Sequence, residues 1–206
     1  MEVNRKQKST VREYVEVIGM ALFLALFIRT FIVQAFKIPS GSMIPTLQIG
    51  DHILVNKMQY GIRIPFWGEY IWEYKKPKRG DVVVFIFPKD HSKDFIKRVI
   101  GVGGDLVEVR NGKVYINNVV INDPHAYFET AESPANGYQM NGDYGPKRVP
   151  KDHIFVMGDN RNKSYDSRYW GYVDLQAVKG KAFIVYWSWD WQDHWARWGR
   201  IGHVIH

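Results

Sequence analysis

The residues from 39 to 45 read PSGSMIP, so that two serines and a glycine lie between two prolines. A tight turn of this kind can present a hydroxyl, from Ser40 or Ser42, beside bare backbone N–H groups. Acyl transfer requires this combination, because the hydroxyl attacks a carbonyl and the N–H groups stabilise the resulting oxyanion. The same composition is typical of a simple linker, and the segment taken alone favours the linker.

A serine nucleophile needs a base, and histidine is the usual one. None of the seven histidines belongs to a recognisable catalytic or metal motif, and the best candidate is His52, ten residues beyond Ser42 on an expected strand. Lys97 is the alternative, since period-two alternation places it on one strand face with Phe95 and Val99. Burial of that face would lower the pKa of Lys97 from about 10.4 by about three units, which takes roughly 4 kcal/mol. A solvated lysine on an edge strand is the commoner arrangement.

A third polar segment, residues 157–168, reads MGDNRNKSYDSR and follows an expected strand. Two aspartates and two arginines so close together can form a hydrogen-bonded scaffold, and a serine hydroxyl there can orient a neutral lysine. Arg98 is next to Lys97 in the chain but points to the opposite face, so the two cannot share one site. A loop without a function can have the same composition.

The elements that must position these residues are mostly strands, and the fold class that we expect is mainly β. The segment at 81–87 is apolar on both faces, which indicates a central strand, and Asn111-Gly112 is typical of a tight hairpin turn. Two loop-like excursions are expected at about 59–78 and 122–150. The expected strands are Asp51–Lys57, Asp81–Phe87, Phe95–Ile100, Leu106–Arg110, Lys113–Ile116, His153–Met157 and Lys181–Trp187.

The body is preceded by an apolar segment from Tyr14 to Phe36, whose residues 17–28 carry no charge. As a helix its 23 residues span about 35 Å, enough to cross a bilayer, and the side chain of Arg29 can reach toward the outer interface. A core helix is one alternative, and a cleaved signal peptide is another because Val33-Gln34-Ala35 resembles a cleavage site. The absence of a polar face favours a retained anchor.

Basic residues flank this segment unequally, with four at positions 5–12 and only Lys37 among the twenty residues after Phe36. The positive-inside rule then predicts residues 1–13 in the cytoplasm, a transmembrane anchor at 14–36, and residues 37–206 outside.

Composition excludes several classes of protein. The 206 residues include no cysteine, which excludes disulfide scaffolds, zinc–thiolate sites, iron–sulfur clusters and cysteine nucleophiles. Mean hydropathy is −0.30, which excludes a protein with many membrane spans. The net charge of +7 suits nucleic acid or an anionic membrane equally, but basic charge beside an anchor weakens the nucleic-acid interpretation.

In their order along the chain these motifs resemble the bacterial type I signal peptidases, membrane-bound serine endopeptidases that remove signal peptides from exported preproteins. The resemblance covers almost the whole chain after Tyr14, and an ordered set with an N-terminal anchor is highly specific. Asn162 and Lys163 stand where many members have acidic or amide residues, and Gly103 stands where proline is common. The matching motifs are PSGSM at 39–43, PTL at 45–47, GD at 50–51, RGDVVVF at 79–85, IKRVIG at 96–101, GD at 104–105, GDNR at 158–161, and Ser164, Asp166, Ser167 and Arg168.

The resemblance implies that Ser42 is the nucleophile and Lys97 the general base. The Ser40 hydroxyl and the Ser42 backbone N–H would form the oxyanion hole. Ser164 would hydrogen-bond Lys97 and orient it, whereas the adjacent Lys163 would lie outside the position of the base.

The resemblance also implies a supporting network of charges formed by Asp166, Arg168 and Arg98. Shallow apolar pockets would accept the −1 and −3 side chains of the substrate and exclude large ones, which explains a preference for Ala-X-Ala. The pocket residues would be Phe36, Ile38, Leu47, Ile53, Val84, Phe95 and Ile96.

The partners implied are signal peptides of exported preproteins and the lipid bilayer, with no cofactor, metal or nucleic acid. The location implied is the bacterial inner membrane, with the catalytic domain outside. Five of the eight tryptophans lie at 187–198, which suggests contact with the outer leaflet, and ordinary core packing is the alternative. Two other functions stay open, a self-cleaving Ser/Lys protease related to stress-response repressors and a non-catalytic membrane-tethered β-domain.

Overall fold

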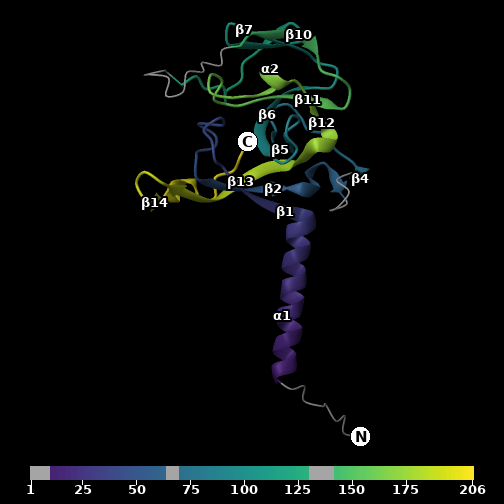
Figure 1. Ribbon diagram of the computed structural model, residues 1–206, viewed down its shortest axis with the longest axis vertical. Helices are drawn as coiled ribbons and strands as arrows, with labels where there is room; N and C mark the ends of the chain where they lie inside the picture. The colour runs from purple at the N-terminus through teal and green to yellow at the C-terminus, as the bar shows by residue number, and fades with distance from the viewer. Residues whose placement is uncertain (1–9, 64–69, 130–141) are drawn as a thin grey trace.

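The computed structural model describes residues 10–63, 70–129 and 142–206, and Figure 1 shows a long helix projecting from a β-rich body. Helix α1, Thr10–Phe27, continues as a single π-helical turn, η1, over Ile28–Ile32. In the described part of the chain, Val11–Ile32 is one helix that is long and apolar enough to cross a membrane by length and composition.

The helix ends before the end of the anchor that we expected at 14–36, because Val33–Lys37 forms strand β1. β1 pairs antiparallel with β2, Asp51–Asn56, along its whole length. The last apolar residues of the segment are therefore part of the body, as the edge strand of its sheet. Beside this junction Lys57 donates a hydrogen bond to the carbonyl of Thr30, one of the helix-end carbonyls that lack an intrahelical partner. Figure 1 shows β1 and β2 where α1 meets the body.

The described residues form one large antiparallel sheet with the strand order β1-β2-β13-β5-β6-β11-β12, and β14 pairs with β13. The apolar strand β5 lies in the middle of this order, which confirms the expectation of a central strand. The remaining members of the sheet are β5 Val82–Ile86, β6 Asp94–Val102, β11 His153–Met157, β12 Val173–Asp174, β13 Val178–Asp190 and β14 Trp195–Ala196.

A smaller four-stranded sheet with the order β10-β7-β8-β9 lies at the end of the body far from α1 (Figure 1). Its β7–β8 hairpin turns at Asn111 and Gly112, both at positive φ, as the Asn-Gly pair predicts. The strands of this sheet are β7 Leu106–Arg110, β8 Lys113–Ile116, β9 Val119–Ile121 and β10 Tyr144–Arg148. A separate hairpin is formed by β3 Gly61–Arg63 and β4 Tyr70–Glu73. The short helices are η2 Lys57–Gln59, α2 Ser167–Trp170, η3 Leu175–Ala177 and η4 Trp198–Arg200.

All seven predicted strands are present, with ends that differ by three residues at most. The mainly β fold class is therefore confirmed. The two excursions contain strands that we did not predict, β3 and β4 in the first and β10 in the second, and their residues 64–69 and 130–141 lie outside the described residues.

The alternation of side chains along β5 and β6 divides the core into two clusters. Val83, Phe85 and Val99 pack on one face of these strands, and Val82 and Val84 pack on the other. A third cluster joins β6 and β11 to the four-stranded sheet. Successive residues of β6 therefore enter different environments, although both environments are buried.

Candidate active site

The segment that carries Ser42 is a turn between β1 and β2, fixed by burial of the residues around it. Met43 and Leu47 are fully buried, and the Leu47 N–H donates to the carbonyl of Met43 at 2.9 Å. The Arg200 guanidinium donates to the carbonyl of Thr46 at 3.0 Å and so holds the far end of the turn. Apolar residues next to Ser42 thus fix a small polar residue at the edge of the core.

Lys97 extends from β6 to Ser42. Its Nζ donates to Ser42 Oγ at 2.7 Å and to the carbonyl of Ile96 at 2.9 Å. The Nζ lies 5.5 Å from the centre of the Phe95 ring, which confirms that the two side chains share a face. Lys97 is only 5% exposed, and this burial lowers the pKa of its amine to about 8, although Asp166 and Asp159 act in the opposite direction.

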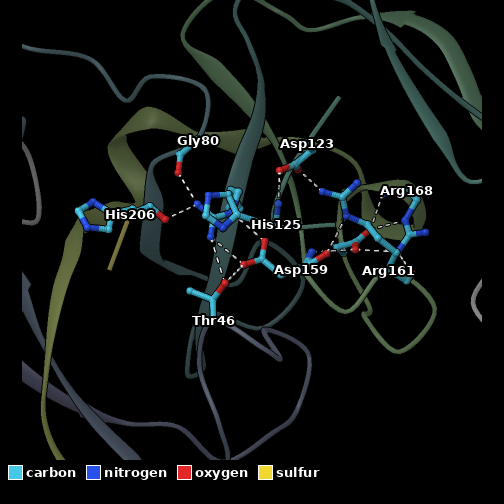
Figure 2. A network of polar contacts seen from close by, with 11 residues as sticks. Thr46, Gly80, Asp123, His125, Asp159, Arg161, Arg168 and His206 are labelled. Atoms are coloured by element: carbon cyan, nitrogen blue, oxygen red, sulfur yellow. Dashed lines mark hydrogen bonds and ion pairs between the residues drawn. The ribbon is translucent and has the colours of Figure 1, made fainter. Parts of the chain in front are cut away.

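Arg98 points to the other face of β6, as the alternation predicts, and forms a buried ion pair with Asp159. Its Nε and Nη2 donate to the two carboxylate oxygens of Asp159 at 2.7 Å each. Thr46 Oγ1 donates to Asp159 at 2.6 Å, and Arg98 also donates to the carbonyls of Gly80 and His206. Figure 2 shows Asp159 beside Thr46 in this network, which ties the Ser42 turn to the loop that carries Asp159.

Asp166 and Arg168 form a second buried pair, separate from Arg98. Arg168 Nε donates to Asp166 Oδ1 at 2.8 Å, and its Nη2 donates to the carbonyl of Arg161 at 2.7 Å. Asp166 also caps α2 and accepts from the N–H of Gly158 at 3.1 Å. In Figure 2 Arg161 lies near Arg168, and Asp123 pairs with Arg161. The charged scaffold predicted for residues 157–168 is therefore formed only in part, because Asp159 pairs with Arg98 and Arg161 pairs with Asp123, both outside the segment.

Gly158 allows this loop to approach the nucleophile closely. A Cβ at position 158 would lie 2.3 Å from the carbonyl oxygen of Ser42 and 2.3 Å from Ser164 Oγ. Ser164 and the Ser42 backbone therefore both lie close to Gly158. A larger residue at position 158 would require one of them to move.

The hydrogen bond that we expected from Ser164 to Lys97 is not made in this structure. Ser164 Oγ is buried and has no hydrogen-bond partner among the described residues. Lys97 instead contacts Ser42 Oγ and the carbonyl of Ile96, which take two of its N–H groups. Ser164 thus lies beside the site but does not orient the amine in this arrangement.

The two expected oxyanion donors are available. Within the described part of the chain neither the Ser42 backbone N–H nor the Ser40 hydroxyl makes a hydrogen bond, and Ser40 is exposed. Both groups can therefore receive an oxygen from a bound molecule.

The expected pocket residues do not all lie together. Six of them pack in one cluster, where four are at most 2% exposed and Phe36 and Ile96 keep accessible surface. Phe95 lies on the opposite face of β6 and stacks on Phe87 with ring centres 4.2 Å apart. The four buried members of the cluster are Ile38, Leu47, Ile53 and Val84.

His52, the other candidate base, and Lys163, which was expected outside the position of the base, make no hydrogen bond to Ser42. His52 packs edge-on against Tyr186, with ring centroids 5.9 Å apart, and Lys163 Nζ donates to Glu129 at 2.8 Å. Asp159 was expected only as a member of the charged scaffold of residues 157–168, and no role was expected for Thr46. The pairs of aspartate and arginine in the 157–168 segment were a signal for Asp159, whereas nothing marked Thr46 as its partner.

A serine hydroxyl in contact with a buried lysine of lowered pKa, held on a β-sheet, is the arrangement that a serine hydrolase with a lysine base requires. The chain matches the family described as "Signal peptidase, peptidase S26" over residues 11–187.

Two sequence relatives agree with this class. A signal peptidase I from Pseudomonas fluorescens is 39% identical over 86% of this chain and 72% of its own length. One from Leptolyngbya laminosa is 39% identical over 88% of this chain and 82% of its own. A solved signal peptidase I from Enterococcus faecalis is 33% identical, with a TM-score of 0.42 over 53% of this chain and 98% of its own. The chain belongs to the signal peptidase family, peptidase S26, and is a signal-peptide-cleaving serine endopeptidase. This membership sets aside both the repressor-type protease and the non-catalytic β-domain.

Proposed function

We propose that Ser42 is the nucleophile and Lys97 the general base with which this endopeptidase cleaves signal peptides after an Ala-X-Ala-like site. The observation that carries the proposal is the 2.7 Å contact between Lys97 Nζ and Ser42 Oγ, made by a lysine that is almost completely buried. A pKa near 8 allows the amine to be neutral at mildly alkaline pH, and only a neutral amine has a lone pair to accept the serine proton.

When Lys97 is neutral, Ser42 Oγ must be the donor in the contact with Nζ. In the first half of the reaction Ser42 Oγ attacks the carbonyl carbon of the −1 residue while its proton moves to the lone pair of Lys97 Nζ. The tetrahedral oxyanion accepts hydrogen bonds from the Ser42 N–H and the Ser40 hydroxyl, which are both unused in the described structure. The C–N bond then breaks, Lys97 returns the proton to the leaving amine, and an ester remains on Ser42. In the second half Lys97 takes a proton from water as the water oxygen attacks the ester. Lys97 then returns that proton to Ser42 Oγ when the ester bond breaks, and the signal peptide leaves with a free carboxyl group.

The supporting residues fix the reacting pair in place. The Arg98–Asp159 pair joins β6 to the Ser42 turn, and Asp166 with Arg168 shapes the loop beneath it. Ser164 has a buried hydroxyl without a partner in the described residues, so we infer that it accepts a hydrogen bond from Lys97 once the amine is protonated. In the resting arrangement that bond is absent.

Specificity for small side chains is proposed to come from the apolar cluster beside Ser42. Phe36 and Ile96 present accessible apolar surface over a filled layer of buried residues, so a bound side chain would rest on a packed layer and could not enter it deeply. Small −1 and −3 residues fit such a surface, whereas larger side chains would meet the packed core. Phe95, on the opposite face, would act by packing against Lys97.

The membrane topology is also a proposal. Residues 1–13 would lie in the cytoplasm, the helical residues 14–32 would cross the inner membrane, and the peptidase domain of residues 37–206 would lie outside, as the basic residues at positions 5–12 predict. The partners would be the bilayer and the signal peptides of exported preproteins, and no step in the proposal uses a metal, a cofactor or nucleic acid.

The test is cleavage of a preprotein with an Ala-X-Ala site by the full chain in detergent micelles. Ser42→Ala and Lys97→Ala should each lower the rate at least 1,000-fold, as expected when one member of a nucleophile–base pair is lost. Lys113→Ala, an exposed lysine on the distant four-stranded sheet, is the matched control and should cleave at the parental rate. Cleavage by Ser42→Ala at the parental rate would refute the assignment of the nucleophile. Loss of activity in His52→Ala together with an active Lys97→Ala would move the base to the histidine.

A further inference from the structure

Asn160 holds the backbone on both sides of the proposed nucleophile. Its main-chain N–H donates to the carbonyl of Ser42 at 3.2 Å, and its side-chain Nδ2 donates to the carbonyl of Gly41 at 3.3 Å. The residue is only 1% exposed, so the surrounding chain packs against it on every side. The orientation of this amide therefore bears directly on the conformation of the Gly41–Ser42 peptide.

Glu129 is the second acceptor for the same amide. Its Oε2 accepts from Asn160 Nδ2 at 2.9 Å, and its Oε1 accepts from Lys163 Nζ at 2.8 Å. The Glu129 backbone is fixed as well, because its N–H donates to Asn162 Oδ1 at 3.0 Å and its carbonyl accepts from Asn162 Nδ2 at 2.6 Å. A carboxylate on a fixed backbone thus faces the residue that holds the nucleophile turn.

The chemistry of the amide explains why a carboxylate matters there. Asn160 Nδ2 carries two hydrogens, and they are directed to Gly41 and Glu129, both of which can only accept. A flipped amide would bring Oδ1 against these acceptors. Asn160 Oδ1 is buried without a hydrogen-bond partner among the described residues, so the orientation is imposed by the two acceptors and not by any group that binds Oδ1. The hydrogen bond from Lys163, followed by that from Asn160, holds the pKa of Glu129 below its ordinary value, which keeps both of its oxygens as acceptors.

We propose that Glu129 is a positioning residue for cleavage, which acts through the Asn160 amide to hold the Gly41–Ser42 peptide in its reactive conformation. The proposal rests on Ser42 being the nucleophile. Lys163 serves only to keep the Glu129 carboxylate in place. The Lys163 side chain is 47% exposed and that of Glu129 is 35% exposed, and ion pairs this accessible contribute little stability.

Three variants of the full chain distinguish the effect of the Glu129 hydrogen-bond acceptor from the effect of its negative charge. Glu129→Ala removes the acceptor and should lower kcat about tenfold, because small misplacements of a reacting group are costly, while KM changes less than about twofold. Glu129→Gln loses the charge but keeps an amide oxygen that can accept from Asn160, so kcat should stay within about threefold of the parent. The charge swap Glu129→Lys with Lys163→Glu restores the ion pair but places a donor against Asn160, so kcat should stay as low as in Glu129→Ala.

Kinetics with an Ala-X-Ala peptide, together with the midpoint of thermal unfolding in detergent, test the proposal. Rescue of kcat by the charge swap, or a Glu129→Gln variant as impaired as Glu129→Ala, would show that the ion pair matters and would overturn the role given to the acceptor. Parental kcat in Glu129→Ala would also overturn it. If Glu129→Ala does not fold, Glu129→Gln and the charge swap still show whether the acceptor or the ion pair of Glu129 is required. An active Ser42→Ala would refute the proposed function, whereas an inactive Ser42→Ala with a parental Glu129→Ala would refute this proposal alone.

Discussion

Replacement of Lys97 by methionine should abolish cleavage and yet stabilise the fold at neutral pH. Burial lowers the pKa of Lys97 from 10.5 to about 8, and a shift of this size corresponds to about 3 kcal/mol at about 1.4 kcal/mol per unit. Lys97→Met removes that penalty and also removes the contacts to Ser42 Oγ and the Ile96 carbonyl, which contribute about 1 kcal/mol each. The net gain at pH 7 is therefore about 1 kcal/mol, or about 2–4 °C in the unfolding midpoint of a chain this long.

The sign of this effect should reverse at high pH. Between about pH 8 and 10.5 the unfolded chain still binds a proton at Lys97 that the folded chain has released, so the stability of the parent rises with pH through this window. Above the window the penalty is gone and only the two lost contacts remain. Lys97→Met should then be less stable than the parent by about 1–2 kcal/mol, with the two curves crossing near pH 9.

The assay is thermal unfolding of the full chain in detergent, followed by circular dichroism at intervals from pH 7 to 10.5. Lys113→Met makes the same chemical change at an exposed position, and its unfolding midpoint should follow that of the parent at every pH. If the difference in unfolding midpoint between Lys97→Met and the parent does not change with pH, Lys97 is not a buried amine of lowered pKa. The assignment of Lys97 as the general base is then refuted as well.

Three further predictions follow from the same geometry. Below about pH 8 the kcat/KM of the parent should fall tenfold per pH unit as Lys97 becomes protonated, and a profile from pH 5.5 to 9 without an acidic limb would contradict a lysine base. Gly158→Ala places a Cβ 2.3 Å from the Ser42 carbonyl, so kcat should fall more than about tenfold in a variant that still folds, and parental kcat would show that the turn can shift freely. Arg98→Met leaves the buried Asp159 carboxylate unpaired and should destabilise the fold by about 3–5 kcal/mol, so an unchanged unfolding midpoint would count against that ion pair.

Much of the fold follows from local patterns in the sequence. The strands alternate or are continuously apolar, and the Asn111-Gly112 turn is specified by two residues that tolerate positive φ. The alternation of side chains along a strand also places Lys97 and Arg98 on opposite faces of β6, and this follows from the sequence alone. Fold class and the central position of β5 could therefore be predicted without knowledge of long-range pairing, whereas Lys97 was favoured as the base only by the family resemblance.

Features that depend on distant partners could not be predicted in this way. Arg98 and Asp159 are far apart in sequence, so no local pattern predicts that they pair. The helix end at Ile32 is set by the pairing of β1 with β2, although an apolar pattern alone continues to Phe36. The hydrogen-bond partner of the Ser164 hydroxyl could not be predicted either, because it depends on how Ser164 packs against Gly158.

The contrast between Lys97 and Arg98 shows how one strand serves both stability and catalysis. The side chains are adjacent, basic and almost fully buried, yet only Arg98 contacts a carboxylate. A guanidinium does not give up its proton in a protein, so its burial requires an ion pair such as the one with Asp159. An amine can lose its proton, so burial without a carboxylate in contact lowers the pKa of Lys97 instead of unfolding the chain. Exchange of the two residue types would place a permanent charge beside Ser42 and a weaker partner beside Asp159, which would damage both the reaction and the fold.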